Sequence, residues 1–300
     1  MKLVRLYDPQ YGPRLGMLSG ERVYDITGII GSGITSPVAL LKHSGYELLT
    51  FLERRVTPYL DNAACYLYDE LDVPARNGRR HLMRPLDPPE VWAAGVTYLQ
   101  SRDAREFETQ TKSIYDRVYE AERPEIFLKA TPHRVVGPYD PVGLRSDSRW
   151  MVPEPELGLV LGVDGNIIGY IAGNDMSCRD IEGENPLYLP QAKIFKNCCS
   201  LGPILALDHP DFDPTSLTIS CRISRQGAVI FDASTSTANL KRSFEELVQC
   251  LIRDNVILPG TVLLTGTCVV PPDEFSLEHG DLIEIAIDGL GVLRNRAECI

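Results

Sequence analysis

The sequence predicts a β-rich α+β fold, with a small N-terminal α+β domain before a larger β-dominated one. Short β-branched segments crowd residues 202–233 and 261–293, whereas helical spacing is clear in few places. A doubly wound α/β sheet would instead alternate strands with long helices. Because residues 72–89 are rich in proline and arginine, we place the boundary there and expect domains at 1–85 and 86–300.

Each element is expected from its own pattern, taken in chain order. The first domain should contain strands at residues 2–7 and within 14–25, and one helix over 37–60 with leucines on its apolar face. In the second domain the expected strands are 90–96, 124–129, 217–223, 228–231, 261–267 and 282–287, and the expected helix is 243–253.

Two polar segments between these elements have open interpretations. Residues 97–122 are polar with helical spacing, which is typical of a lid over a site or of a surface helix. On the strand that follows, Glu125, Phe127 and Lys129 share one face. The acid and the base would form an exposed ion pair or would project into a cleft as catalytic groups.

The most informative stretch is an expected hairpin that bears three acids. Glu154 and Glu156 begin one apolar run, Asp175 ends a second, and Asp164-Gly165 between them is a preferred two-residue turn. With that turn, Glu154 lies opposite Asp175 with Cβ atoms roughly 5 Å apart, and Glu156 lies opposite Gly173. The glycine would leave room for a ligand between carboxylates on one face.

Such a cluster is a candidate metal site. Three carboxylates on one face repel one another, and a divalent cation removes the repulsion. All-oxygen ligands favour Mg²⁺, with Mn²⁺ or Ca²⁺ as alternatives, over zinc. A solvated strand face is the other interpretation of Glu154 and Glu156, but the apolar flanks and the third acid in register favour the metal.

Composition excludes several classes of partner. The net charge of −11 is unfavourable for general nucleic-acid binding and for anionic membrane surfaces. No apolar run approaches the roughly 20 residues of a membrane span. The start of the chain lacks a signal-peptide pattern, and its 8 cysteines show no Cys-x-x-Cys pair. We therefore expect reduced thiols and a cytoplasmic protein.

Familiar catalytic motifs are missing from the sequence. It contains no dinucleotide-binding glycine pattern, no Walker A sequence and no Gly-x-Ser-x-Gly elbow. The 5 histidines show no ligand spacing. Residues 264–268 follow an expected strand and expose hydroxyl and N–H groups, which would bind a carboxylate or form a polar turn.

The order of several motifs resembles the fumarylacetoacetate hydrolase superfamily. These motifs are Glu154-x-Glu156-Leu157, Gly169-Tyr170, Asn174-Asp175-x-Ser177-x-Arg179-Asp180, Lys193-x-Phe195, Gly202-Pro203 and Thr265-Gly266-Thr267. Residues 123–132, 145–148, 153–157 and 184–191 look like the 2-keto-3-deoxy-D-arabinonate dehydratase branch. The resemblance covers about residues 86–300, and residues 1–85 carry no comparable motif.

The resemblance implies a mixed β-roll or sandwich for the second domain, with the site in its mouth. It implies Mg²⁺ on Glu154, Glu156 and Asp175, the set that the hairpin register gives independently, and a homo-oligomer, either dimer or tetramer. Glu125 and Lys193 are implied as the acid/base pair. The expected substrate contacts are Thr97, Tyr98, Arg102, Lys129 and Thr267.

The implied reaction is the conversion of 2-keto-3-deoxy-D-arabinonate to 2,5-dioxopentanoate. Lys193 would take the C3 proton and Glu125 would protonate the leaving C4 hydroxyl, or the roles would be reversed. Hydrolases of the superfamily commonly place a catalytic histidine after the first buried strand, and residues 95–103 contain none. An acylpyruvate-type C–C hydrolase or oxaloacetate decarboxylase, and a non-catalytic metal-stabilised scaffold, are the alternatives.

Overall fold

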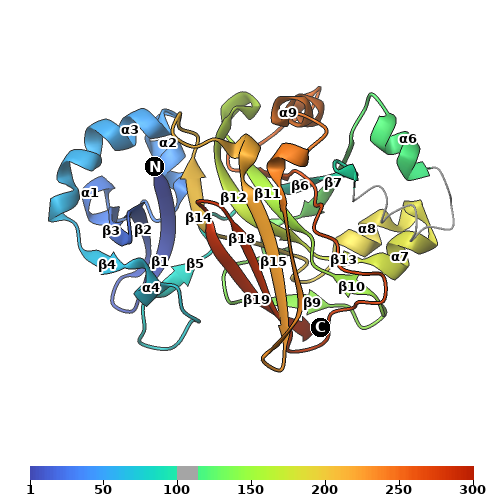
Figure 1. The fold of residues 1–300 in the computed structure, drawn as a ribbon. Coiled ribbons are helices and arrows are strands. Elements are labelled where there is room, and N and C mark those ends of the chain that lie inside the picture. Colours follow the sequence, from blue (N-terminus) through green and yellow to red (C-terminus); the bar gives the residue numbers. More distant parts are fainter. Residues whose placement is uncertain (100–113) are drawn as a thin grey trace.

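The computed structural model describes residues 1–99 and 114–300, the side chains of residues 114–116 excepted. Among these residues the chain forms two large β-sheets and a short strand pair, with short helices around them (Figure 1). The predicted β-rich α+β class is confirmed. Arg102 and most of the expected lid lie outside the described residues. No described helix is long and apolar enough to cross a membrane.

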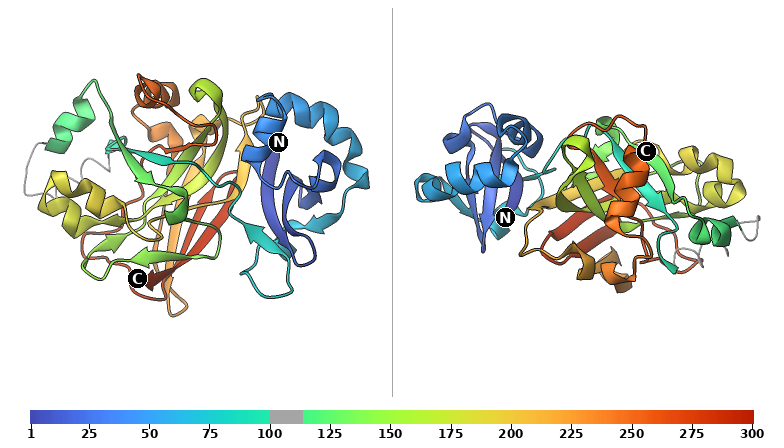
Figure 2. Two further views of the ribbon diagram at one scale, coloured as in Figure 1. Left: turned by 180° about the vertical axis from the view of Figure 1, so that it is seen from behind. Right: turned by 90° about the horizontal axis from the view of Figure 1, so that it is seen from above.

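The first part of the chain forms the lobe that is blue in Figure 1, which Figure 2 shows from behind and from above. Its elements are β1 (Lys2–Asp8), β2 (Gly12–Ser19), β3 (Arg22–Asp25), α1 (Thr27–Ile30), α2 (Pro37–His43), α3 (Leu48–Arg55), the 3-10 helix η1 (Thr57–Asn62), β4 (Cys65–Leu67), α4 (Tyr68–Leu71) and β5 (His81–Met83).

The prediction of one helix over residues 37–60 is wrong. The segment contains α2, α3 and part of η1, and the first break falls at Gly45 and Tyr46. These residues have φ of 65° and 70°, which lies outside the right-handed helical region. Leucines at helical spacing identify the buried face, because Leu40, Leu41, Leu48 and Leu52 are in the core, but they do not show where the helix stops.

The larger part of the chain supplies the strands of the site. Its elements are β6 (Val91–Gly95), α6 (Ile114–Glu120), β7 (Glu125–Ala130), η2 (Pro132–Arg134), β8 (Val135–Val136), β9 (Pro141–Leu144), β10 (Met151–Val152), β11 (Pro155–Leu161), η3 (Val163–Gly165), β12 (Ile167–Asp175), β13 (Ser177–Cys178), α7 (Arg179–Glu184), η4 (Pro186–Tyr188), α8 (Leu189–Lys193), β14 (Cys199–Leu207), η5 (Pro214–Ser216), β15 (Thr218–Arg225), β16 (Ala228–Ser236), η6 (Thr237–Asn239), α9 (Phe244–Ile252), β17 (Val262–Leu264), β18 (Leu282–Ile287) and β19 (Gly291–Cys299).

One long mixed sheet runs through both parts of the chain. Its order is β4-β3-β2-β1-β14-β12-β11-β17-β6-β7, and a second sheet has the order β16-β15-β18-β19-β9. The pairing of β1 with β14, through Lys2 with Ala206 and Leu3 with Leu205, makes the lobe continuous with the rest. A boundary at residue 85 therefore separates two lobes that share one sheet. The division of the chain into separate domains at 1–85 and 86–300 stays a prediction.

The hairpin of β11 and β12 lies in the middle of the long sheet. Every residue of β11 and of β14, which pairs with β12, is buried, as are the last seven residues of β12. At one end of these strands α7 and α8 gather beside β7 (Figure 1). Polar side chains at this end of the hairpin are therefore enclosed by protein.

The predicted register of the hairpin is confirmed at the acids. Glu156 pairs with Gly173, and the Asp175 N–H donates to the Glu154 carbonyl oxygen at 2.9 Å. The space expected at Gly173 is not there for a ligand. A Cβ at this position would lie 2.5 Å from Leu264 Cδ2, so the glycine admits the Leu264 side chain instead.

The predicted turn at Asp164-Gly165 is present, because the Asn166 N–H donates to the Val163 carbonyl oxygen at 3.2 Å. The strand pairing beside the turn differs from the expected one. Leu161 pairs with Ile167, one residue earlier than expected, and the connection spans residues 162–166, where Asp164 and Gly165 have φ of 56° and 78°. A bulge between Val160 and Leu161 then restores the expected pairing toward the site. The shifted pairing at Leu161 and the bulge offset each other, which is why the register at the acids is correct.

Candidate metal and acid–base site

The three acids of the predicted metal site lie together. Glu154 comes immediately before β11, Glu156 is the second residue of that strand, and Asp175 ends β12. One oxygen of each carboxylate lies within 4.8 Å of the others. All three side chains are buried, with exposures of 2% or less. Their proximity is as predicted.

Three buried cations face these acids. Lys193 Nζ donates to Glu154 Oε2 at 2.6 Å and to Asp175 Oδ2 at 3.2 Å. Arg179 Nη2 donates to Glu154 Oε1 at 2.8 Å, and Lys129 Nζ lies 2.6 Å from Asp175 Oδ1. Three positive and three negative formal charges therefore meet in a site with little access to water, where each depends on its partners.

Lys129 is surrounded by partners from the protein itself. Its ammonium lies against Asp175 and also donates to the carbonyl oxygens of Met176, at 2.8 Å, and of Lys193. Two of the three donors of the ammonium thus bond backbone oxygens, and its charge is paired with Asp175. The fully buried Lys129 is placed to orient Asp175, and its contact with substrate stays a prediction.

Glu156 has a different electrostatic environment from the other two acids. Its carboxylate accepts a hydrogen bond from the Gly266 N–H at 2.7 Å, and among the described residues it forms no ion pair. Burial, followed by the nearby carboxylates of Asp175 and Glu154, raises the pKa of Glu156 well above its ordinary value. This carboxylate is the member of the set that most needs a further positive charge.

We expect Glu156→Gln to stabilise the metal-free protein more at pH 8 than at pH 5. An acid with a raised folded-state pKa contributes most to stability below its unfolded value, near 4.5, and this contribution is lost as the pH rises toward the folded value. Glutamine does not titrate, so the variant escapes that loss. Thermal denaturation in EDTA at both pH values measures the effect, and an equal shift at both would contradict it.

Glu125 lies on the strand face that borders the cluster. The Lys193 ammonium is 5.7 Å from the ring centroid of Phe127, which shares that face of β7 with Glu125 and Lys129. Glu125 pairs with Gly95 of β6, and a Cβ there would lie 2.2 Å from Glu125 Oε2. Because Lys129 is buried in the site, the interpretation of this face as an exposed ion pair is wrong.

Two loops join at Glu156. Thr97 Oγ1, in the loop after β6, donates to the Thr265 carbonyl oxygen at 2.7 Å, while the Gly266 N–H binds Glu156. The loop at residues 264–268 therefore binds a carboxylate, but one of the protein's own. Thr267 is buried and its hydroxyl oxygen accepts a hydrogen bond from the N–H two residues later, at 3.3 Å.

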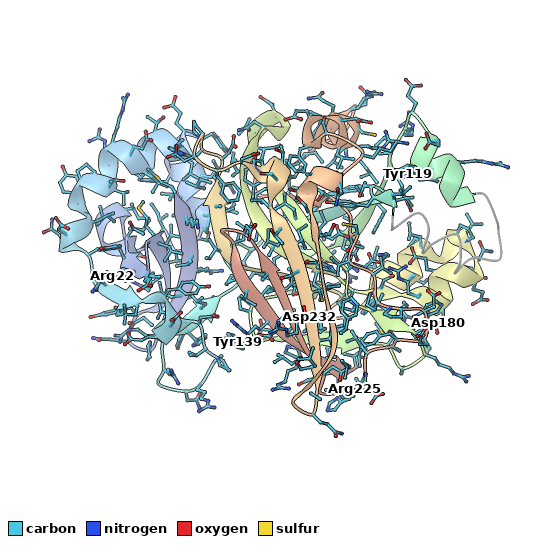
Figure 3. The ribbon with its side chains drawn as sticks, in the orientation of Figure 1. Arg22, Tyr119, Tyr139, Asp180, Arg225 and Asp232 are labelled. Atoms are coloured by element: carbon cyan, nitrogen blue, oxygen red, sulfur yellow. The ribbon has the colours of Figure 1, made fainter. Side chains whose placement is uncertain are left out.

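Arg179 is the cation whose role was not predicted. It was quoted only as part of a motif, and a cation four residues after Asp175 was the available signal. Asp180, its neighbour in that motif, has no part in the cluster. Asp180, the second residue of α7 (labelled in Figure 3), accepts from Ser148 Oγ at 2.6 Å and from the Arg149 N–H at 2.7 Å.

The residues present fit a hard divalent cation. The donor set is entirely carboxylate oxygen, as Mg²⁺ prefers, and Glu156 is buried without a cationic partner among the described residues. Lys193 contacts both other acids, so bound metal and the ammonium would share the same carboxylates. The geometry thus combines a metal-type acid set with an adjacent amine.

The comparison with known proteins defines the class. Residues 90–298 match the family described as the fumarylacetoacetate (FAA) hydrolase C-terminal domain, and this range contains every site residue described above. The chain belongs to the fumarylacetoacetate hydrolase family. The long sheet, the second sheet and the acid-bearing hairpin are thus the family fold that the sequence motifs implied.

Its relatives include sugar-acid dehydratases. The chain is 51% identical over 216 residues to a probable 2-keto-3-deoxyxylonate dehydratase of Haloferax volcanii, covering 72% of this chain and 74% of that protein. It is 46% identical to 2-dehydro-3-deoxy-D-arabinonate dehydratase of Saccharolobus solfataricus, covering 71% and 72%. A solved structure of 2-keto-3-deoxy-D-arabinonate dehydratase complexed with magnesium and 2,5-dioxopentanoate superposes with a TM-score of 0.82 at 36% identity, covering 100% and 99% of the chains.

Proposed function

We propose that this chain is a Mg²⁺-dependent hydro-lyase that converts 2-keto-3-deoxy-D-arabinonate to 2,5-dioxopentanoate. The observation that carries the proposal is the contact of Lys193 Nζ with Glu154 and Asp175, two acids of a buried metal-type set. An amine beside bound metal is suited to proton transfer at a carbon next to a carbonyl. The dehydratase relatives and the solved complex with magnesium support the same activity.

The two substrate names among the relatives do not conflict. Conversion of a pentonate to its 2-keto-3-deoxy form removes the stereocentres at C2 and C3. Arabinonate and xylonate with the same configuration at C4 therefore give one compound. The only remaining stereocentre is the carbon that bears the leaving hydroxyl, so the D configuration at C4 is the feature that the site would have to recognise.

The reaction needs proton transfers at more than one carbon. Loss of a C3 proton and of the C4 hydroxyl, as water, gives a 3,4-unsaturated 2-keto acid in which C5 is the hydroxymethyl carbon. Removal of a C5 proton and uptake of a proton from solvent at C3 leave an enol. Its protonation at C4, with loss of the hydroxyl proton, gives the aldehyde. The overall change is the loss of one water, without any oxidant or reductant.

Two groups of this chain are proposed to carry these protons. Lys193 takes the C3 proton, and Glu125, on the neighbouring face of β7, protonates the departing hydroxyl. Bound Mg²⁺ would polarise the C2 carbonyl and so acidify C3. Glu154, Glu156 and Asp175 would hold the ion, with Lys129 and Arg179 fixing the orientations of Asp175 and Glu154.

The alternative reactions are tested by the products. C–C hydrolysis on the same metal set would need an activated water, and residues 95–103 offer no histidine for it. Decarboxylation would release CO₂. A non-catalytic metal-stabilised scaffold would gain thermal stability with Mg²⁺ but would bind no 2-keto acid. The presence of both an acid, Glu125, and a buried amine, Lys193, favours an enzyme.

With Mg²⁺ and a panel of 2-keto-3-deoxy sugar acids, we expect a semialdehyde product from the D-pentonate. In D₂O, solvent deuterium should appear at C3 and C4 of 2,5-dioxopentanoate, because both carbons are protonated during the reaction. NMR of the product checks both statements. Pyruvate, or CO₂, as the product would contradict dehydration, and the L configuration at C4 serves as the control substrate.

Assembly and location complete the proposal. We propose a homo-oligomer, a dimer or a tetramer, in the cytoplasm. The resemblance and the expected reduced thiols support these two statements. Light scattering on the purified protein would test the first, and a monomer at micromolar concentration would contradict it.

A further inference from the structure

One fully buried side chain near the site carries a polar atom without a partner. Tyr98 is 0% exposed, and among the described residues its hydroxyl has no hydrogen-bond partner. Leaving a buried hydroxyl unpaired costs free energy, and such groups in native proteins call for a physical reason. A group that a ligand supplies is one such reason.

The backbone that holds Tyr98 is itself unusual. Val96, two residues earlier, has φ of 52°, a region that β-branched residues rarely adopt and that costs conformational energy. Thr97 is fixed by its bond to Thr265, and a Cβ on Gly266 would lie 2.0 Å from Thr97 Oγ1. The loop after β6 is therefore held in a strained conformation against the loop that binds Glu156.

The loop that carries Tyr98 meets the loop that binds Glu156, because Thr97 Oγ1 donates to the carbonyl oxygen of the residue before Gly266. Burial, followed by the nearby Cys268 and Glu156, raises the pKa of Tyr98 above its ordinary value. The hydroxyl therefore keeps its proton at neutral pH and can donate it in a hydrogen bond. The acceptor of this hydrogen bond would be an atom of a ligand bound in the site.

We infer that the Tyr98 hydroxyl is a hydrogen-bond donor to the 2-oxo-carboxylate end of the substrate. This rests on the proposed function, since it presumes a 2-keto acid beside the carboxylate set. The end of the substrate is assigned by position, because the loop of Tyr98 is bonded to the loop that binds Glu156, one of the acids that would hold the metal. A donor there discriminates for a keto acid over the corresponding apolar compound.

The inference predicts opposite effects of Tyr98→Phe on binding and on stability. Pyruvate with Mg²⁺ is the probe, because it carries the 2-oxo-carboxylate group without the distal hydroxyls. The Kd for pyruvate should rise about tenfold, near the value of one hydrogen bond to a charged group. The ligand-free Tm should rise by about 2 °C, because the unpaired hydroxyl is removed while the ring is kept.

Tyr170→Phe is the matched control. Tyr170 is also buried, but its hydroxyl donates to Asp208 at 3.0 Å, and it lies on β12 on the face opposite Asp175. The same substitution should lower the Tm and leave the pyruvate Kd unchanged. Calorimetric titration of Mg²⁺ alone should give wild-type affinity for both variants.

Each result supports or overturns the inference. Unchanged pyruvate affinity in Tyr98→Phe, or a lower ligand-free Tm, would overturn it, because the hydroxyl would then have no ligand or would already have a partner. A fall in Mg²⁺ affinity alone would overturn the assignment to the organic ligand. If the wild-type protein dehydrates the pentonate while Tyr98→Phe binds pyruvate normally, only the inference fails. If the wild-type protein neither dehydrates the pentonate nor binds pyruvate, the proposed function itself is refuted.

Discussion

Replacement of Lys193 by methionine is expected to lower turnover by about 10²- to 10⁴-fold, the usual range for a group that transfers a proton. Methionine retains much of the side-chain volume and removes the ammonium. The variant should still bind Mg²⁺, and bind it at least as tightly as the wild type. In the wild type, Lys193 forms ion pairs with Glu154 and Asp175. Without its ammonium, the three acids face two cations instead of three.

The same change should make folding depend on the metal. Removal of one partner from a buried cluster leaves carboxylate charge uncompensated, and a bound cation restores the balance. The Tm of Lys193→Met should therefore rise more with Mg²⁺ than that of the wild type. Lys42→Met, at an exposed position of α2, is the control. It should change neither the Tm of the metal-free protein nor the rise in Tm with Mg²⁺.

Hydrogen exchange into pyruvate separates the base from the acid. Pyruvate has exchangeable C3 protons but no C4 hydroxyl, so NMR in D₂O with Mg²⁺ follows proton removal alone. Lys193→Met should lose this exchange, and Glu125→Gln should keep it while losing dehydration. The reverse pattern would exchange the two roles, and normal turnover by Lys193→Met would remove Lys193 from the mechanism.

The sequence was most informative where side chains alternate along one strand pair. Glu154, Glu156 and Asp175 were placed together because a period of two and a turn residue define which positions are opposite. Their placement survived a one-residue shift in the pairing of Leu161 because a bulge compensated for it. A one-residue shift in pairing changes which side chains share a face unless a second shift reverses it. The correct register therefore also depended on a bulge, which no residue type in the sequence indicates.

The partners of these acids could not be read from the sequence in the same way. Lys129 and Lys193 are far from Asp175 along the chain, and which of them touches substrate depends on the packing of β7 and α8 around the hairpin. Glycines were misread for a similar reason. Gly173 looked like space for a ligand, whereas Leu264 fills that space, and Gly95 is the position that admits Glu125.

Replacement of Lys129 should have a different effect from replacement of Lys193, and Lys129→Met tests this. Lys129 is bonded to groups of the protein, so its replacement should chiefly lower the stability of the fold. Asp175 would lose an ion pair and two carbonyl oxygens would lose their donor, which costs about 3 to 5 kcal/mol for a buried pair, or about 5–10 °C in Tm for a chain of this size. Thermal denaturation of the metal-free protein would measure the loss.

The charge state supports a full effect at neutral pH. Burial lowers the pKa of Lys129 and the Asp175 carboxylate raises it, and the net shift is upward. A cation with a raised folded-state pKa contributes its whole stabilisation below its unfolded value, near 10.5, and loses it only as the pH rises through the folded value. The Tm difference between Lys129→Met and the wild type should thus be constant between pH 7 and pH 9.

An exposed ion pair gives the matched control for this prediction. Arg222 Nη2 lies 2.8 Å from Asp232 Oδ2, and both side chains are about half exposed; Asp232 is labelled in Figure 3, away from α7 and α8. Arg222→Met should change the free energy of unfolding by less than about 1 kcal/mol. If Lys129→Met were equally mild, the buried ammonium would not be holding Asp175. The residual activity of Lys129→Met, measured with saturating Mg²⁺ below the Tm of the variant, should exceed that of Lys193→Met. The reason is that Lys129 orients an acid, whereas Lys193 moves a proton.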